Sequence, residues 1–256
     1  MAYKQLKLWF DGELATLLGN KIIEAGHSID VAAFSTSIDE QVQPLELKDR
    51  VEVIADELDS FLGKSYLRNL TVLLSILGPE NEEETGMFAN FYWVMPIAKF
   101  IEKYGLDNFE ESMNGIKEIT KRNTGEYTIR PYIEKYPERT IEVMEEWSKD
   151  SNFHVRRLAS EGGRPRLPWA PKLDQFIDDP SPLLPILENL KDDTKKYIQK
   201  SVANCLNDIL KDNPEIAKAI IENWKKDATK ERAWIIKHAL RNLLKKEDAW
   251  ALLIVK

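Results

Sequence analysis

Hydrophobic side chains recur every three or four positions along most of the chain, which is the spacing of a helix with one buried face. Residues 12–25 and 45–62 show this pattern most regularly. In the first of these segments the apolar face is formed by Leu14, Leu17, Leu18, Ile22 and Ala25. Two dipeptides, Asp11-Gly12 and Asn114-Gly115, are typical of hairpin turns, but no alternating segments flank them. The sequence therefore predicts an all-α protein.

The C-terminal half contains a repeat. Residues 136–147 (Tyr-Pro-Glu through Trp) return as residues 213–224 (Asn-Pro-Glu through Trp), 77 positions later, and a divergent copy covers 180–190. A second helix is expected after each copy, beginning near Val155, Ile198 and Ile235. Such spacings are typical of two-helix HEAT units, which stack into a curved solenoid with a concave binding face. We therefore predict one HEAT-like domain over 1–256, with 1–100 as a helical capping segment and 101–256 as repeats.

The composition argues against a membrane segment, a signal peptide, a disulfide and a zinc site. No window approaches 18 consecutive apolar residues, and residues 1–7 lack an apolar signal run. The single cysteine, Cys205, excludes an intramolecular disulfide, and no spacing of Cys and His resembles a zinc site. We expect a cytoplasmic protein, acting as a monomer, with no membrane contact, no metal and no cofactor.

The net charge of -7 is unevenly distributed. Residues 1–100 carry 8 Lys and Arg against 16 Asp and Glu, whereas residues 101–256 carry 28 against 27. Residues 154–172 hold five Lys and Arg and one acid, Glu161. Because affinity for phosphates depends on the local field, the acidic total does not exclude nucleic acid.

Polar rows recur on the three expected second helices. Their members are Arg157, Glu161 and Arg164; then Lys200, Asn204, Asp208 and Lys211; then Lys237, Arg241 and Lys245. A single row is typical of a solvated surface with ion pairs, but recurrence at the repeat period favours a basic groove. The expected DNA contacts are Arg156, Arg157, Arg164, Arg166, Lys200, Asn204, Lys237 and Arg241. Glu161 and Asp208 would repel phosphates, so they either orient basic side chains or stabilise a developing cation.

Residues 161–169 (Glu-Gly-Gly-Arg-Pro-Arg-Leu-Pro-Trp) are the least ordinary stretch. Two glycines are expected to end a helix, and Pro165 and Pro168 prevent its resumption. Trp169 is then either a core residue or an exposed ring whose face would attract a cationic base. Glu126, taken alone, is typical of an acid in the first turn of a helix.

The segment 154–169 resembles the AlkC branch of the AlkC/AlkD DNA glycosylases. The resemblance continues through 178–182 (Asp-Asp-Pro-Ser-Pro), 201–208 (Ser-Val-Ala-Asn-Cys-Leu-Asn-Asp) and 45–55, and so extends over most of the chain. It implies a bacterial enzyme of base excision repair that removes alkylated bases, chiefly 3-methyladenine and 3-methylcytosine, from double-stranded DNA. It further implies a catalytic cluster at the positions of Glu126, Glu161, Trp169 and Asp208.

Carboxylates suit this chemistry. A base alkylated at N3 is cationic and leaves readily, while positive charge develops on the sugar, where a carboxylate in a partly desolvated cleft stabilises it. The interpretation favours Asp208 for that role, in a monofunctional glycosylase that leaves an abasic site. Two alternatives stay open: a non-catalytic HEAT scaffold that binds DNA or protein, and an enzyme of the AlkD branch acting on 7-methylguanine.

Overall fold

The computed structural model describes residues 4–85 and 88–256 and contains no strand within them. The predicted all-α class is therefore confirmed. The chain forms two compact units: the first comprises the described residues of Met1–Glu82 and Gly86–Thr128, and the second comprises Glu83–Thr85 and Ile129–Lys256. The predicted division at residue 100 stays a prediction.

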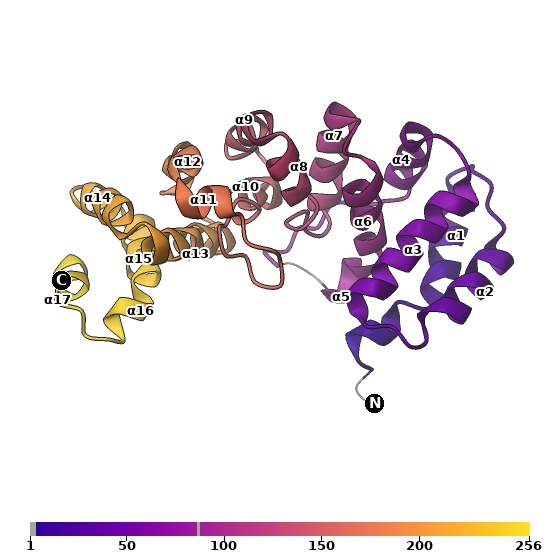
Figure 1. Cartoon of the computed structure of the whole chain (residues 1–256), viewed down its shortest axis with the longest axis horizontal. Helices are drawn as coiled ribbons and strands as arrows, with labels where there is room; N and C mark the ends of the chain where they lie inside the picture. The colour runs from indigo at the N-terminus through magenta and orange to yellow at the C-terminus, as the bar shows by residue number, and fades with distance from the viewer. Residues whose placement is uncertain (1–3, 86–87) are drawn as a thin grey trace. The chain divides into compact units, whose positions relative to one another are not determined.

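The first unit consists of two short 3-10 helices and packed α-helices (Figure 1). Its elements are η1 (Leu6–Trp9), α1 (Gly12–Glu24), α2 (Val31–Val42), α3 (Leu47–Leu62), α4 (Tyr66–Ser75), α5 (Phe88–Phe91), η2 (Tyr92–Val94), α6 (Met95–Tyr104) and α7 (Phe109–Thr120). Helix α1 buries Leu14, Leu18 and Ile22 as expected, but Leu17 is 37% exposed, and Ala25 is also exposed and follows the end of the helix. The buried face predicted from spacing alone therefore contained two residues too many.

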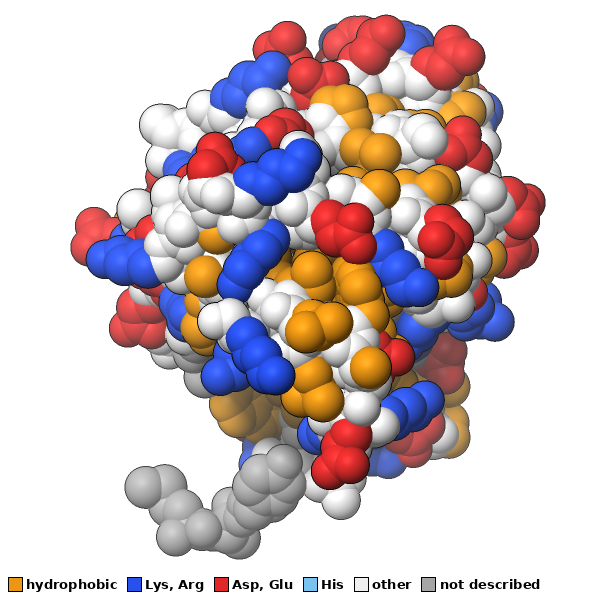
Figure 2. Space-filling model, turned by 90° about the vertical axis from the view of Figure 1, so that its left-hand side faces the viewer, with side chains coloured by type: hydrophobic (Ala, Val, Ile, Leu, Met, Phe, Trp, Pro, Cys, Tyr) orange, Lys and Arg blue, Asp and Glu red, His pale blue; other side chains and the backbone are white. Residues whose placement is uncertain are grey.

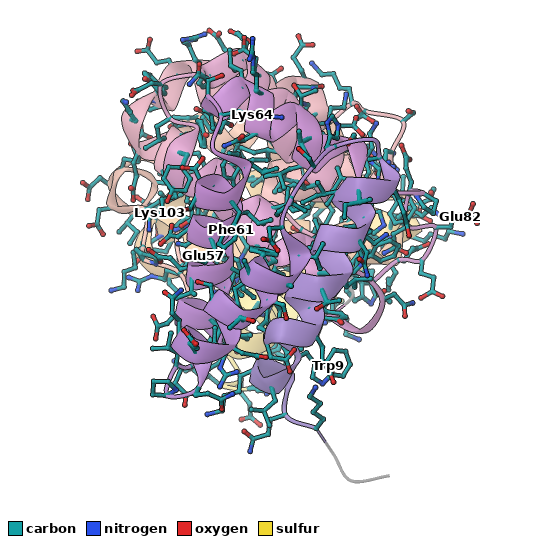
Figure 3. The ribbon with its side chains drawn as sticks, turned by 90° about the vertical axis from the view of Figure 1, so that its right-hand side faces the viewer. Trp9, Glu57, Phe61, Lys64, Glu82 and Lys103 are labelled. Atoms are coloured by element: carbon teal, nitrogen blue, oxygen red, sulfur yellow. The ribbon has the colours of Figure 1, made fainter. Side chains whose placement is uncertain are left out.

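Helix α3 lies between α2 and α6 in this unit. On one side the Glu57 carboxylate accepts hydrogen bonds from α2, and the Phe61 ring packs edge-on against Phe34 at 5.4 Å. On the other side, Lys103 of α6 donates to Glu52 and Asp56 at 2.9 and 2.8 Å (Figure 3). Apolar packing and ion pairs on opposite sides thus fix α3 within the unit.

The second unit contains the predicted repeats. Its elements are α8 (Arg130–Lys135), α9 (Pro137–Trp147), α10 (Phe153–Glu161), α11 (Asp174–Asp178), η3 (Ser181–Leu183), α12 (Leu184–Leu190), α13 (Lys196–Asp212), α14 (Pro214–Lys225), α15 (Lys230–Ala239), α16 (Arg241–Leu244) and α17 (Ala249–Ile254). Helix α9 packs on α10, α12 on α13 and α14 on α15, and the second helices pack in the order α10, α13, α15 (Figure 1). These three pairs correspond to the three sequence repeats.

The repeated residues have the same structural role in the two similar copies. Pro137 and Pro214 occupy the first turns of α9 and α14, where a backbone N–H would have no partner within the helix, so its absence in proline costs nothing. Trp147 and Trp224 are buried. The start of the second helix in the third repeat was predicted near Ile235, and this prediction is wrong. Helix α15 begins at Lys230, because the Thr229 side chain caps it by accepting from the Arg232 amide.

Helix α15 also ends at Ala239, and Arg241 begins a separate helix, α16. The predicted third polar row, from Lys237 through Arg241 to Lys245, therefore crosses a helix boundary.

Hydrophobic side chains gather among Lys and Arg on the face that Figure 2 shows. Leu252 and Leu253 of α17 are 39% and 68% exposed. Among the helices of the described residues, none is both long and apolar enough to cross a membrane.

Candidate active site

Helices α10 and α13 bring two carboxylates to one arginine. Glu161 is the last residue of α10, and Asp208 lies in the last half of α13. Arg164 follows α10 and bonds to both: its Nη1 is 2.7 Å from Glu161 Oε1, and its Nε is 2.9 Å from Asp208 Oδ2. All three residues are buried, at 5, 6 and 2% exposure for Glu161, Arg164 and Asp208. The fold thus turns residues 44 positions apart into one ion-paired cluster.

Further side chains extend this cluster at both ends. At the Glu161 end, Ser201 Oγ donates to Oε2 at 2.6 Å, and Arg157 Nη2 lies 3.4 Å from Oε1. At the Asp208 end, Lys211 Nζ lies 3.6 Å from Oδ1 and is exposed. These bonds satisfy the buried carboxylate oxygens. Without such partners, burial of an ionised carboxylate would strongly destabilise the protein.

The surroundings shift the two carboxyl pKa values in opposite directions. Burial alone would raise the pKa of Glu161, but Arg157, Arg164 and the Ser201 hydroxyl together hold it below its ordinary value. Burial also raises the pKa of Asp208, and there Arg164 and Lys211 offset only part of the effect. Asp208 is therefore the carboxyl of this pair whose charge responds to pH nearer neutrality.

Gly162 and Gly163 let this turn lie close to its neighbours. A Cβ at Gly162 would lie 2.6 Å from Ile129 Cγ2, and one at Gly163 would lie 2.7 Å from Leu183 Cδ2. The sequence prediction that these glycines end the helix is right about position. The cause is close packing, however, because Gly162 keeps right-handed helical angles.

The loop after Arg164 is tied down at its base. Arg130, which is buried, donates from Nη1 to the carbonyls of Gly162 and Arg164 at 3.1 and 3.0 Å. The Leu173 amide donates to the Pro165 carbonyl at 3.1 Å and closes the loop. Within it, Trp169 is 83% exposed and has a φ of 66°, a left-handed conformation that non-glycine residues rarely adopt. The interpretation of Trp169 as a core residue is therefore wrong.

The expected DNA contacts fall into two groups. Arg156 and Arg166 bond to carboxylates of this chain, at Asp193 and Asp212, and Arg164 bonds to the pair described above. Arg157 joins that cluster and stacks on the Tyr197 ring, 4.9 Å from its centre. The other group lies on α13, α15 and α16 and comprises Lys200, Asn204, Lys237 and Arg241, of which Lys200 and Lys237 are exposed. Their assignment as DNA contacts stays a prediction.

Glu126 lies in the first unit, unlike the other three residues of the predicted catalytic cluster. Its Oε2 is 3.2 Å from the Thr124 hydroxyl. Helix α8 begins only at Arg130, so the interpretation of Glu126 as a first-turn acid is wrong. Among the described residues, no group of three or more His, Cys, Asp or Glu side chains is arranged to hold a metal ion.

Sequence reasoning missed two residues of the site, Ser201 and Arg130. Ser201 lies seven positions before Asp208, two helical turns along the same face of α13, so helical spacing offered a signal for it. Arg130 lies 32 and 34 positions from the carbonyls that it holds, and no local pattern connects them.

Comparison with known proteins identifies the class of the chain. Residues 69–243 match the model of the DNA alkylation repair enzymes. Because this match covers more than half of the sequence, the chain belongs to that family.

Two relatives narrow the similarity further. The structure of Pseudomonas fluorescens alkylpurine DNA glycosylase AlkC, bound to DNA containing an abasic site analogue, matches with a TM-score of 0.89 and 34% identity, over 99% of this chain and 68% of that one. The uncharacterized protein YhaZ of Bacillus subtilis is 40% identical over 208 residues, which are 81% of this chain and 56% of YhaZ. The chain thus spans little more than half the length of this relative. The match to AlkC confirms the resemblance to that branch and its helical solenoid fold.

Proposed function

We propose that this protein is a monofunctional DNA glycosylase that hydrolyses the N-glycosidic bond of 3-methyladenine and 3-methylcytosine and leaves an abasic site. The observation that carries the proposal is the buried Glu161–Arg164–Asp208 cluster at the start of a loop that exposes Trp169. The similarity to an AlkC structure holding DNA with an abasic site analogue supports it. We further propose that it acts as a monomer in the bacterial cytoplasm.

Asp208 supplies the negative charge in this mechanism. As the bond to the cationic base breaks, positive charge moves onto the deoxyribose, and a carboxylate that is little screened by water stabilises this charge strongly. Arg164 acts as a positioning residue, since its bond to Oδ2 fixes one face of the carboxylate. Glu161 in turn fixes Arg164, and Ser201 holds Glu161. The lesion is a good leaving group because it is already cationic, so no general acid is required.

Base release from methylated DNA tests the proposal. Purified protein is incubated with DNA treated with a methylating agent, and the released bases are separated by chromatography. Release of 3-methyladenine and 3-methylcytosine is the expected result. Release dominated by 7-methylguanine would assign the AlkD-type specificity, and DNA binding without any released base would assign a non-catalytic scaffold.

The pH dependence should reveal the raised pKa of Asp208. The mechanism needs the ionised carboxylate, so single-turnover excision should fall as pH decreases through that pKa, at a higher pH than an ordinary aspartate would give. Glu161, whose pKa is lowered, stays ionised over the same range and adds no step. Rates are measured from neutral pH down to below the pKa of an ordinary aspartate, after subtraction of spontaneous base loss. A fall in rate at no higher pH than an ordinary aspartate gives would contradict the role of Asp208.

Trp169 should contribute to holding the cationic lesion. Trp169→Ala removes an indole face whose attraction for a cation is about 1–2 kcal/mol, which corresponds to a roughly 5–30-fold loss of excision. Because Trp169 is 83% exposed, the free energy of unfolding should hardly change. Trp169→Phe, which keeps a smaller ring, should fall between the two. Equal rates for all three proteins would remove Trp169 from the site.

A further inference from the structure

A cluster of cationic side chains surrounds a stacked Trp–His pair on the second unit, at the surface of α13, α15 and α16. The rings of Trp234 and His238 on α15 stack at 4.7 Å, with an angle of 11° between their planes. Lys196 of α13 places its Nζ 3.4 Å from the centre of the Trp234 ring, on the π system. Arg241, at the start of α16, donates to the His238 carbonyl at 2.8 Å. Two helices and the turn after them thus bring these side chains together.

The cluster has more positive charges than carboxylates. Burial and the charge of Arg164 hold the pKa of Arg241 below its ordinary value, and the Asp208 carboxylate acts in the opposite direction. Lys196, Lys200 and Lys237 are exposed, and neither they nor Arg241 form an ion pair with any described residue. This contrasts with Arg156, Arg164 and Arg166, whose charges are each matched by a carboxylate of the same chain. Unmatched cations at close range repel one another, and an anion bound among them relieves that repulsion.

The same positive charges affect the pKa of His238. Burial, followed by the charges of Arg241, Lys200 and Lys196, holds the pKa of His238 below its ordinary value. These groups come from α13 and α16, and the neighbouring Trp234 is uncharged. Helix α14 also packs on α15, but none of its charged groups is among the causes of the shift. An anion placed among them would reverse the balance, because it would favour the protonated imidazole.

The cluster continues along α13 from Asp208, on a face that turns by about 40° with every four residues. Lys196, Lys200, Asn204 and Asp208 follow one another at intervals of four residues, and Asn204 Oδ1 accepts from Arg241 Nη2 at 3.1 Å. Eight residues of helix separate Lys200 from Asp208, a rise of about 12 Å. For a duplex whose axis runs parallel to α13, that distance corresponds to about three or four nucleotides along one strand.

We propose that Lys196, Lys200, His238 and Arg241 form a binding site for one phosphodiester of the damaged duplex, about three or four nucleotides from the lesion, and that His238 takes up a proton when it is filled. The proposal rests on the proposed function for its ligand. It goes beyond that function in assigning a proton-linked phosphate site outside the catalytic cluster. Trp234 holds Lys196 and His238 in place, since its ring contacts both.

Nuclear magnetic resonance tests the proton uptake directly, because the chain has only three histidines, His27, His154 and His238. The His238 resonance, assigned by its absence in His238→Gln, should titrate at a lower pH than an ordinary histidine in the free protein. It should titrate at a higher pH when the protein is saturated with duplex DNA carrying an abasic site analogue. An unchanged His238 titration on saturation would overturn the proposal. So would an equal shift with inorganic phosphate at matched ionic strength, which would indicate a small-anion site.

Binding measurements locate the phosphate. Fluorescence anisotropy should show that DNA affinity increases by up to about tenfold per unit decrease in pH between the two pKa values, and that His238→Gln abolishes this increase. Lys200→Gln should lower the magnitude of the slope of log K against log salt by about one, while the control Lys225→Gln, an exposed lysine of α14, should not. Equal slopes for Lys200→Gln and Lys225→Gln would overturn the site.

Single methylphosphonate linkages, which remove one charge from the DNA, should eliminate the pH dependence at one position about three or four nucleotides from the abasic site. Absence of any such position would also overturn the site.

Loss of base excision with retained proton-linked binding would reject the proposed function alone. Normal excision with no response of His238 would reject the phosphate site alone, and absence of DNA binding would reject both.

Discussion

Asp208→Asn should lower single-turnover excision of 3-methyladenine by roughly 100-fold or more while DNA binding is retained. The substitution keeps the shape of the side chain but removes the charge that would stabilise the sugar cation in the transition state. Binding should be unchanged or tighter, since a negative group near phosphates is neutralised. The rate constant and the dissociation constant are measured on the same duplex, so that loss of chemistry is separated from loss of affinity.

Asp212→Asn is the matched control. Asp212 ends α13, four residues after Asp208, and it accepts two hydrogen bonds from Arg166, so this variant removes the same charge and also breaks an arginine pair. Its excision rate should stay within a few-fold of the wild type. If Asp208 were only structural, Asp208→Asn would resemble this control in rate. Near-normal excision by Asp208→Asn would remove Asp208 from the mechanism and turn attention to Glu161.

Arg164→Met should destabilise the protein by about 3–5 kcal/mol, because two buried carboxylates would lose their shared partner. The pKa of Asp208 should rise further without the arginine, so excision near neutral pH should fall and partly recover at higher pH. Urea unfolding gives the stability change, and the pH profile of excision gives the effect on Asp208. Unaltered stability together with an unaltered pH profile would show that Arg164 does not control the charge of Asp208.

Arg164→Lys provides the comparison. Lysine retains the charge but lacks the planar group that bonds through Nη1 to Glu161 and through Nε to Asp208. It should therefore lie between Met and Arg in stability, with a smaller displacement of the pH profile. A loss equal to that of Arg164→Met would mean that the geometry of the guanidinium, and not its charge, holds the site.

Local patterns were sufficient for the helices and for the order of the repeats. The spacing of apolar residues placed α1 and α3 within two residues of their observed ends, since a buried helical face needs that spacing. The Pro–Trp repeat predicted two of the helix pairs, because the proline starts a helix and the tryptophan is buried in its packing, and the divergent copy at 180–190 predicted the third. The beginning of α15 was predicted wrongly because the cap at Thr229 depends on a single hydroxyl.

For the site, the sequence determined which residue types were present, and the tertiary structure decided what they contact. Glu161, Arg164, Trp169 and Asp208 were identified from an unusual loop, from polar positions at helical spacing and from a family resemblance. Spacing along one helix could not show that Arg164 is buried between carboxylates of two helices, because that contact depends on how α10 packs against α13. The same packing raises the pKa of Asp208 and lowers that of Glu161, since burial and neighbouring charges are properties of the folded chain.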